Sequence, residues 1–352
     1  MPAERHGAVG IARLALLTLA TVGPLLAAGG ATARTLKIAT VLPEGSSWMR
    51  EMRAAGGEIA KETRDRVKLK FYPGGIMGDD KTVLRKLRAG QLHGAAFTSG
   101  ALAQVVPDTE LYSLPFLFRN YAEVDYVRER LDPAIRSGLE AAGFAVLAIS
   151  DGGFAYLLSR KPLRKVDDLV GTKVWIIEGD IMSETALEVA GVTPVPLPLA
   201  DVYTGLQTGL VDTIAAPPQG AIAFQWHTKV KYLTDVPLMY LVGVLAVDRR
   251  VFDKLSDQDQ KTVRNIIGAA ARRLDSENRR GDVAAKQALA NQGIEFVTAS
   301  SDAELERWRD IAVEAVDLLR KQDRYSDQMI DDIQATLETF RSENENADGN
   351  GP

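Results

Sequence analysis

The sequence predicts an α/β protein of two lobes that are joined by a long strand and a long helix. Strand-like and helix-like segments alternate twice along the chain of 352 residues. An apolar run over residues 238–247 is long enough to cross between two sheets, and helix-forming residues continue from 256 to 292. Because alternating strands and helices build a largely parallel sheet with helices on both faces, each set of segments predicts one α/β lobe.

The first set of segments follows a short β-branched run near the start of the folded chain. Serine hydroxyls cap helix starts, alternation of apolar and polar residues indicates strands, and glycine ends helices. The expected elements are a strand at 36–41, a helix from Ser46 or Ser47 to Arg64, a strand at 67–72, a helix at 79–89 ended by Gly90, and a strand at 92–97.

The second set begins near residue 152 and has the same alternation. Prolines and glycines separate its segments. The expected elements are a strand at 173–177, a helix at 181–190, a strand at 192–197, a helix at 201–208 and a strand at 211–215. The apolar run at 238–247 is then expected to cross between two sheets and return the chain to the first lobe.

Helices dominate the rest of the chain. Ser256 to Asp259 matches a capping box, and the helix that follows would be ~50 Å long, enough to lie along both lobes. Gly281 leaves an alternative open, in which two helices join at residues 280–281. Further helix is expected over residues 305–340. The polar tail at 342–352 is expected to be disordered.

The first 33 residues have the pattern of a cleavable export signal. Arg5 and Arg13 give a positive start, residues 14–28 are mostly apolar, and residues 31–33 (Ala-Thr-Ala) fit the signal peptidase, so cleavage is expected after Ala33. A retained membrane anchor is the alternative, but the apolar run is short and contains a Gly-Pro pair.

These segments give a division of the chain into domains. The expected parts are a signal peptide at 1–33, lobe I at 34–151 plus 242–281, lobe II at 152–241 plus 282–309, a C-terminal helical segment at 310–341 and a disordered tail at 342–352.

Composition excludes several classes of function. The formal net charge is −5, so nucleic acid is not an expected partner, and the absence of cysteine excludes disulfides and thiolate metal sites. The chain has three histidines and no G-x-S-x-G, Walker or H-E-x-x-H motif. We therefore expect no enzyme activity, no metal and no cofactor. Two lobes, export and the lack of catalytic motifs suggest a monomeric binding protein that closes on a ligand.

Four stretches carry a resemblance to a known family. They are YPGGIMGDD at 72–80, LRAGQL at 87–92, GTKV at 171–174 and DVYTGLQTGLVD at 201–212. In this order they resemble the DctP-type solute-binding subunits of tripartite ATP-independent periplasmic (TRAP) transporters, over nearly the whole mature chain. The resemblance implies a periplasmic protein with a Venus-flytrap fold. It also implies that a small-molecule ligand is bound between the lobes and passed to a large and a small membrane subunit.

The chain departs from this family at positions whose side chains bind the ligand in other members. The family normally has an arginine after the third stretch that grips a substrate carboxylate, and this chain has Trp175 there. A second arginine, sometimes present in the strand that joins the lobes, corresponds to Phe154. The polar residues that usually follow the fourth stretch are replaced by residues 213–217 (Thr-Ile-Ala-Ala-Pro), which include Ala216.

Other residues aligned near the same cleft are apolar as well, namely Val41, Phe97 and Leu199. Tyr203 is a further candidate, although its helical spacing also suits a place in a core. A buried carboxylate without a charged partner costs several kcal/mol, and each buried aromatic or aliphatic contact contributes ~1.5–3 kcal/mol. The expected ligand is therefore neutral, apolar or amphipathic.

Alternatives remain open at this stage. Arg160 or Arg119 could replace the missing arginine and bind an organic acid, and Glu178 or Asp151 could bind a cationic group. The protein could also feed a sensor rather than a transporter. A hydrolase would need an acid/base pair that the sequence does not reveal.

Overall fold

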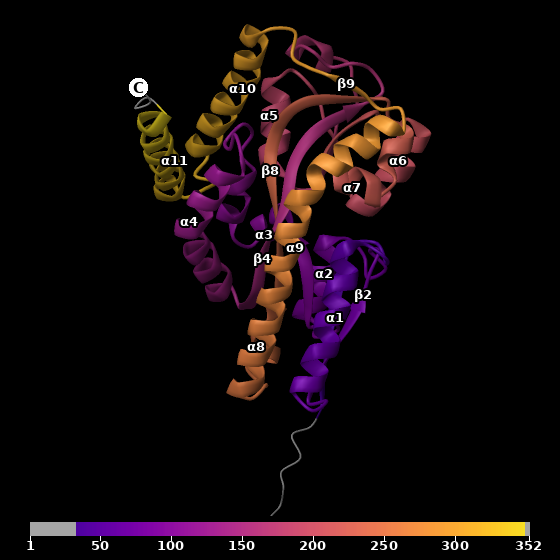
Figure 1. The fold of residues 1–352 in the computed structure, drawn as a ribbon, viewed down its shortest axis with the longest axis vertical. Helices are drawn as coiled ribbons and strands as arrows, with labels where there is room; N and C mark the ends of the chain where they lie inside the picture. Colours follow the sequence, from indigo (N-terminus) through magenta and orange to yellow (C-terminus); the bar gives the residue numbers. More distant parts are fainter. Residues whose placement is uncertain (1–32, 349–352) are drawn as a thin grey trace, which may run out of the picture. The chain divides into compact units, whose positions relative to one another are not determined.

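The computed structural model of the chain describes residues 33–348, which form one compact unit (Figure 1). Residues 1–32 of the predicted signal peptide and residues 349–352 of the predicted tail lie outside the described residues. No described helix is long and apolar enough to cross a membrane.

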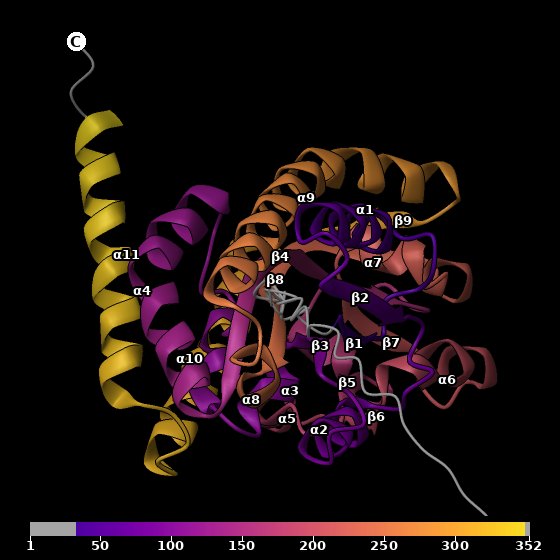
Figure 2. The ribbon, with the colours of Figure 1, turned by 90° about the horizontal axis from the view of Figure 1, so that it is seen from below.

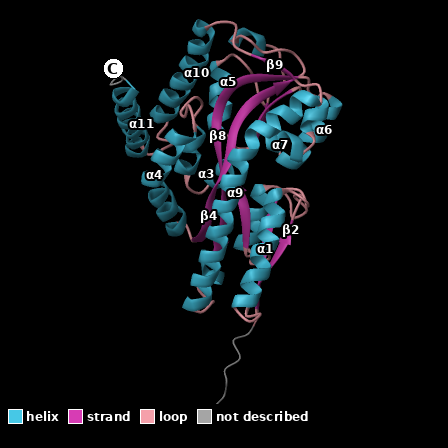
Figure 3. Ribbon diagram, viewed as in Figure 1, coloured by secondary structure: helices cyan, strands magenta, loops and turns pink. Residues whose placement is uncertain are grey.

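A seven-stranded sheet forms the centre of the fold (Figure 3). Its strands are β1 (Arg34–Thr40), β2 (Val67–Tyr72), β3 (Gly94–Thr98), β4 (Phe144–Ser159), β7 (Thr213–Ala216), β8 (Tyr232–Asp248) and β9 (Glu295–Val297). The order is β2-β1-β3-β8-β4-β7, and β9 pairs with β8. A separate two-stranded parallel sheet consists of β5 (Trp175–Ile177) and β6 (Val195–Leu197).

Helices surround both sheets. They are α1 (Ser47–Glu62), α2 (Asp80–Arg88), α3 (Ser99–Ala103), α4 (Tyr121–Ala141), α5 (Ile181–Val189), α6 (Val202–Thr208), α7 (Pro218–Ala223), α8 (Arg249–Phe252), α9 (Asp257–Asn291), α10 (Asp302–Lys321) and α11 (Asp327–Asp348). Residues 33–348 also contain four 3-10 helices: η1 (Pro107–Ser113), η2 (Val166–Leu169), η3 (Leu199–Asp201) and η4 (Trp226–Lys229).

The strand directions differ in part from the prediction of a largely parallel sheet. Strands β1, β2 and β3 are parallel, as expected. Strand β8 is antiparallel to both β3 and β4, and β7 is antiparallel to β4. The reason is the connectivity, because β4 leaves the first set of strands and β8 returns to it in the opposite direction.

Strands β4 and β8 pair along nearly their whole lengths, from Phe144 opposite Asp248 to Ser159 opposite Tyr232. The predicted apolar run lies within β8. The expectation that it crosses between two sheets is wrong, because β4 and β8, despite three register shifts, belong to a single sheet, with β3 joined at one end and β7 at the other. We call the part built on β1–β3, α1 and α2 the N-terminal lobe, and the part built on β5–β7 and α5–α7 the second lobe.

The predicted helix starts are confirmed by their caps. The Ser46 hydroxyl accepts a hydrogen bond from the amide of Met49 at 3.3 Å, and Asp79 caps α2 through the amide of Thr82 at 2.8 Å. Each bond satisfies one of the free amides in the first turn of its helix. Around β1–β3, α1 and α9 lie on one side, and α2 and α3 lie on the other (Figure 2).

The long helix α9 is continuous through Gly281, so the alternative of two joined helices does not hold. It packs on α1 in the N-terminal lobe, on β4, and on α7 in the second lobe. A Cβ atom on Gly281 would lie 2.8 Å from Nε2 of Gln219. The glycine therefore permits the close approach of α7 rather than a break in the helix.

Replacing Ser256 with alanine should destabilise the protein by about 1 kcal/mol, because the Ser256 hydroxyl accepts from the amide of Asp259 at 3.1 Å at the start of α9. Urea unfolding followed by circular dichroism measures the change. Ser256→Asp, which keeps an acceptor at this position, serves as the control and should lie close to the wild type. Equal stability of the alanine variant and the wild type would contradict the cap.

A buried charge network lies where β4, β8 and α9 pass between the lobes. The Asp151 side chain has no exposed surface and accepts from Arg128 at 2.8 Å and from Arg279 at 2.5 Å. The Tyr240 hydroxyl donates to the same carboxylate, and the Asp151 amide donates to Asp275 at 2.8 Å. Together these bonds connect α4, both long strands and α9.

The last two helices attach to different parts of the protein. Helix α10 packs on α5, and α11 packs on α4. The expected disordered tail differs from the structure, because α11 continues to Asp348. Arg341 holds this helix by donating to Glu123 on α4 at 2.8 Å, and the rings of Tyr126 and Phe340 lie 5.0 Å apart.

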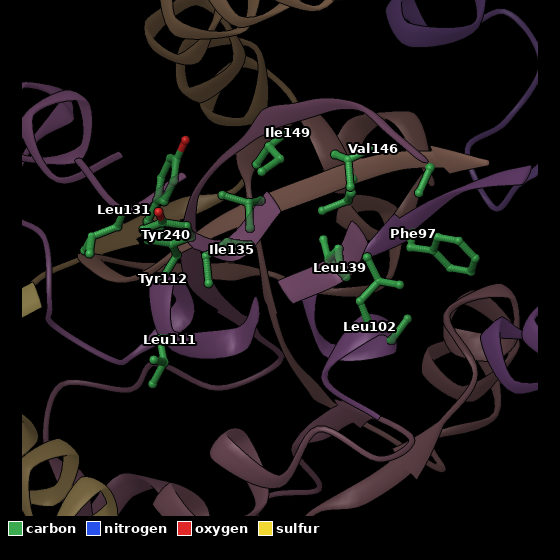
Figure 4. Close-up of a cluster of buried hydrophobic side chains, with 14 of the residues drawn as sticks. Phe97, Leu102, Leu111, Tyr112, Leu131, Ile135, Leu139, Val146, Ile149 and Tyr240 are labelled. Atoms are coloured by element: carbon green, nitrogen blue, oxygen red, sulfur yellow. The ribbon is translucent and has the colours of Figure 1, made fainter. Parts of the chain in front are cut away.

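Buried apolar side chains fill both faces of the central sheet. The largest cluster joins the strands to α3, η1, α4 and α11 (Figure 4). A second cluster lies between the sheet, α1 and α9. The second lobe has its own core, in which Trp175 and Trp226 lie side by side with ring centroids 5.4 Å apart.

Candidate functional site

A small hollow lies between the two lobes at the carboxyl ends of their parallel strands. Val41 follows β1, Glu178 follows β5, and Leu199 follows β6. Ligands of open α/β folds bind outside the carboxyl ends of strands, because the loops there meet at one edge. We call this site the interlobe hollow; its lining is Val41, Gly78, Asp79, Asp80, Lys81, Gln104, Ile177, Glu178, Pro198, Leu199 and Ala200.

The loop between β2 and α2 supplies much of the wall of the N-terminal lobe. Gly78 has a φ of 99°, and a Cβ atom there would lie 2.6 Å from Cγ2 of Thr82. Only glycine fits this conformation and this approach. Gly75, which also has a positive φ, comes close to Ala200 across the hollow: its added Cβ would lie 3.4 Å from that side chain.

The charged side chains of the hollow are mostly acidic. Hydrogen bonding to Thr82 lowers the pKa of Asp79, which caps α2. Burial raises the pKa of Asp80 to about 6, an effect that a hydrogen bond from Thr98 partly offsets. Lys81 is bound to Glu178 at 2.6 Å, across the boundary between the lobes.

The apolar part of the lining comes mainly from the second lobe. Ile177, Pro198, Leu199 and Ala200 face Val41 of the N-terminal lobe. The cavity volume is about 30 Å³, room for one or two water molecules. In this arrangement the lobes are closed on each other, and a solute would enter only when they separate.

Two of the predicted site residues meet in this hollow. Val41 and Leu199 line it from opposite lobes. Tyr203 lies at the edge of the second core, with the Lys229 ammonium 5.0 Å from its ring. The remaining four, Phe97, Phe154, Trp175 and Ala216, are buried in the hydrophobic clusters, and contact between them and a ligand stays a prediction.

Each of these aromatic side chains has protein partners in the closed arrangement. Phe154 packs on Tyr121, with ring centroids 5.0 Å apart, and Phe97 packs on Phe144 at 6.2 Å. The indole N–H of Trp175 donates to the carbonyl of Leu197 at 3.0 Å. Trp175 and Ile177 lie on the same face of β5. Ile177 lines the hollow, whereas Trp175 is buried in the core of the second lobe.

The structure also places the polar alternatives. Arg160 donates to the carbonyl of Lys229 at 3.3 Å, and neither Arg160 nor Arg119 lines the hollow. Asp151 is fully buried between two arginines, so it is not available to a cationic ligand. Glu178 does lie in the hollow. Among residues 33–348, no group of three histidine, aspartate or glutamate side chains is placed to hold a metal ion.

Sequence reasoning missed Asp80, Lys81 and Gln104 as lining residues. The signal that points to Asp80 and Lys81 is their position, directly after the glycine-rich turn that follows β2. Gln104 follows the short helix α3 and carries no comparable signal. Carboxylates at the end of a strand-loop segment lie at the edge where ligands enter.

Comparisons with known proteins agree with this architecture. The family described as bacterial extracellular solute-binding protein, family 7 (DctP), matches residues 38–322. The chain is 27% identical over 279 residues to the 2,3-diketo-L-gulonate-binding periplasmic protein of Escherichia coli, covering 75% of this chain and 84% of that protein. It is 28% identical over 197 residues to the C4-dicarboxylate-binding protein of Rhodobacter capsulatus, covering 55% and 59%.

Solved structures show the same fold. A sugar-acid-binding protein from Advenella mimigardefordensis in complex with galactonate has a TM-score of 0.81, with 20% identity over 88% of this chain and 99% of that one. A TRAP solute-binding protein from Xanthobacter autotrophicus with bound galacturonate has a TM-score of 0.79, with 23% identity over 86% and 99%. At these identities the likeness concerns the fold.

Proposed function

Because this chain belongs to family 7 of the bacterial extracellular solute-binding proteins, we propose that it is the periplasmic binding subunit of a TRAP transporter and binds a solute that has no free carboxylate. The family consists of solute-binding proteins rather than enzymes, and its members serve membrane subunits. The lining of the interlobe hollow is the observation that carries the proposal about the ligand.

The charges of the interlobe hollow disfavour an organic acid. No arginine lines it, and its one cation, Lys81, is already bound to Glu178. A ligand carboxylate would come close to the acidic side chains of Asp79 and Asp80. It would also lose its hydration without gaining a bidentate hydrogen-bonded pair with an arginine. The cost of burying such a charge is several kcal/mol, which favours a neutral, apolar or amphipathic solute.

The apolar part of the same lining supports this ligand class. Leu199, Ile177 and Val41 each offer aliphatic surface that a solute can cover when the lobes close. Full burial of one such side chain contributes ~1.5–3 kcal/mol. A second candidate function, the binding of an organic acid, is favoured by the sugar acids and dicarboxylates bound by the similar proteins. That acid would have to draw Lys81 away from Glu178.

We also propose that the chain is exported by its first 33 residues and works in the periplasm. The first described strand begins at Arg34, directly after the expected cleavage site. Transport and sensing differ in their genetic setting. Genes for one large and one small multi-span membrane protein beside this one support transport, whereas a neighbouring histidine kinase supports sensing.

Protein purified from cells is expected to release an apolar or amphipathic compound when it is extracted with organic solvent and analysed by mass spectrometry. At 100 times its dissociation constant, this compound should add ~2.7 kcal/mol to the free energy of unfolding. Two variants separate the candidate functions. Leu199→Asn should weaken binding of the compound, and Lys81→Met should leave it nearly unchanged. Recovery of dicarboxylates or sugar acids alone, with binding lost in Lys81→Met, would replace this proposal by the second candidate.

A further inference from the structure

A buried junction joins three elements that are far apart in the sequence. Glu110 lies on η1, Asp180 caps the start of α5, and Arg324 and Tyr325 lie in the turn between α10 and α11. The backbone of Gly100 lies beside the first two: a Cβ atom added there would stand 3.4 Å from Oε1 of Glu110 and 4.0 Å from Cβ of Asp180. We call these four side chains the carboxyl junction.

Glu110 is 1% exposed, and only one of its oxygens has a hydrogen-bond donor. The Tyr325 hydroxyl donates to Oε2 at 2.7 Å, while Oε1 has no partner among the described residues. Burial, and next to it the negative charge of Asp180, raises the pKa of Glu110 to about 9. A protonated Glu110 has an O–H group that can donate to the Asp180 carboxylate.

Most other charged groups around Glu110 bond to other partners, although Nε of Arg324 has no hydrogen-bond partner among the described residues. Asp180 accepts from the amide and the hydroxyl of Ser183 at 2.9 and 2.7 Å. Arg324 lowers the pKa of Glu110, but its guanidinium bonds to the carbonyl of Ala103 at 3.4 Å. Asp108, also on η1, accepts from the amide of Ser326 at 2.9 Å. The groups closest to Glu110 are thus one carboxylate, one phenol and one arginine.

The carboxyl junction lies across the boundary between the lobes. Helix η1 packs on α3, which packs on β3 of the N-terminal lobe. Its residues Leu111 and Tyr112 lie in the large cluster that also contains Met182 of α5. Asp180 belongs to the second lobe. The turn that carries Tyr325 connects α10, which packs on α5, to α11, which packs on α4. Glu110 is buried and Asp180 is partly buried, so the charge of Asp180 disfavours the ionised form of Glu110.

We propose that the carboxyl junction is a proton-dependent latch, in which protonated Glu110 holds the lobes closed against Asp180. Opening the lobes would separate the two carboxylates and expose Glu110 to water, where its pKa returns toward the ordinary value of about 4.5. Closure then takes up one proton at neutral pH. The latch is independent of the nature of the ligand.

The sign of the pH dependence follows from this proton. A group whose pKa is higher in the closed form stabilises closure fully below the pKa of the open form. That contribution is lost as the pH rises toward the pKa of the closed form. Between about pH 5 and pH 9, the ratio of closed to open protein should therefore fall by up to tenfold per pH unit.

The absence of cysteine makes a direct measurement possible. Spin labels on Glu58→Cys in α1 and Gln207→Cys in α6, both exposed positions, report the distance between the lobes by pulsed electron paramagnetic resonance. The ligand-free full chain is measured from pH 5 to pH 9. Short distances should dominate at pH 5 and lengthen as the pH rises. In Glu110→Gln, which donates to Asp180 at every pH, short distances should persist throughout.

Two further variants keep the test decisive. Asp180→Asn removes the opposing charge but leaves Glu110 buried, so its distances should lengthen less with pH than those of the wild type. Asp108→Asn changes a neighbouring acid on η1 and should follow the wild type. Circular dichroism at each pH reports that every variant is folded. A wild type whose distances do not lengthen overturns the latch. So does a wild type whose pH profile is shared by Glu110→Gln.

Discussion

Replacing Asp151 with alanine is expected to destabilise the protein by about 3–5 kcal/mol, the largest loss at any single polar residue described above. The substitution leaves Arg128, whose side chain is 11% exposed, without its fully buried carboxylate partner, and it breaks the bond to Arg279. Removing one member of a buried ion pair is costly because the remaining charges stay buried without compensation. Urea unfolding monitored by circular dichroism gives the change in the free energy of unfolding.

Asp132→Asn is the matched control for this network. Asp132 also accepts from Arg128, at 2.9 Å, but its side chain is 27% exposed, so water can replace the lost charge. We expect a loss of under about 1 kcal/mol. If Asp151→Ala lowers the free energy of unfolding no more than Asp132→Asn does, then the buried charge network around Asp151 does not stabilise the folded chain.

Trp175→Arg should destabilise the second lobe by several kcal/mol. Trp175 is 6% exposed in a cluster that also contains Trp226 and Val202. Arginine would lose the apolar contacts of the indole and would bury a charge that has no carboxylate partner. The indole N–H bond to Leu197 would be lost as well. Thermal and urea unfolding measure this change, and ligand affinity is measured on whatever fraction remains folded.

Trp175→Phe separates packing from charge. Phenylalanine keeps most of the apolar contact with Trp226 and loses mainly the hydrogen bond, so the expected cost is about 1–2 kcal/mol. The emission of Trp175, obtained as the difference between wild type and this variant, should already be blue-shifted in the closed protein. A Trp175→Arg variant as stable as the wild type would show that the side chain is not part of the core.

Much of the fold could be predicted because its elements begin and end with strong local signals. Ser46, Asp79 and Ser256 cap helices, and their side chains accept hydrogen bonds from backbone amides in the first turn. Elements without such signals were missed. Helix α4 contains Pro133, and β4 contains Gly152 and Gly153, residues that usually interrupt helices and strands. These elements form because of tertiary packing rather than local sequence preference. Strand β4, for example, pairs with β8 on one side and with β7 on the other.

The site was harder to predict than the fold. Large aromatic side chains at motif positions suggested a pocket, but Phe154 has Tyr121 and Tyr240 as neighbours, and their rings fill its surroundings. A sequence cannot tell which partner will cover an aromatic ring. Val41 and Leu199 were found through the family resemblance, which aligns them near the ligand cleft. The acidic residues beside them were interpreted as parts of a turn and a helix start.

The pairing of β3 with β8 has a consequence for the order in which this protein can fold. Strand β3 ends at Thr98, and its partner Val247 opposite Gly94 is synthesised about 150 residues later. At the usual pace of translation that interval lasts roughly 10–30 s. During this time β1, β2 and β3 present a free edge that can pair with other chains. The sheet of the first lobe can therefore be completed only after β8, which ends at Asp248, has been synthesised.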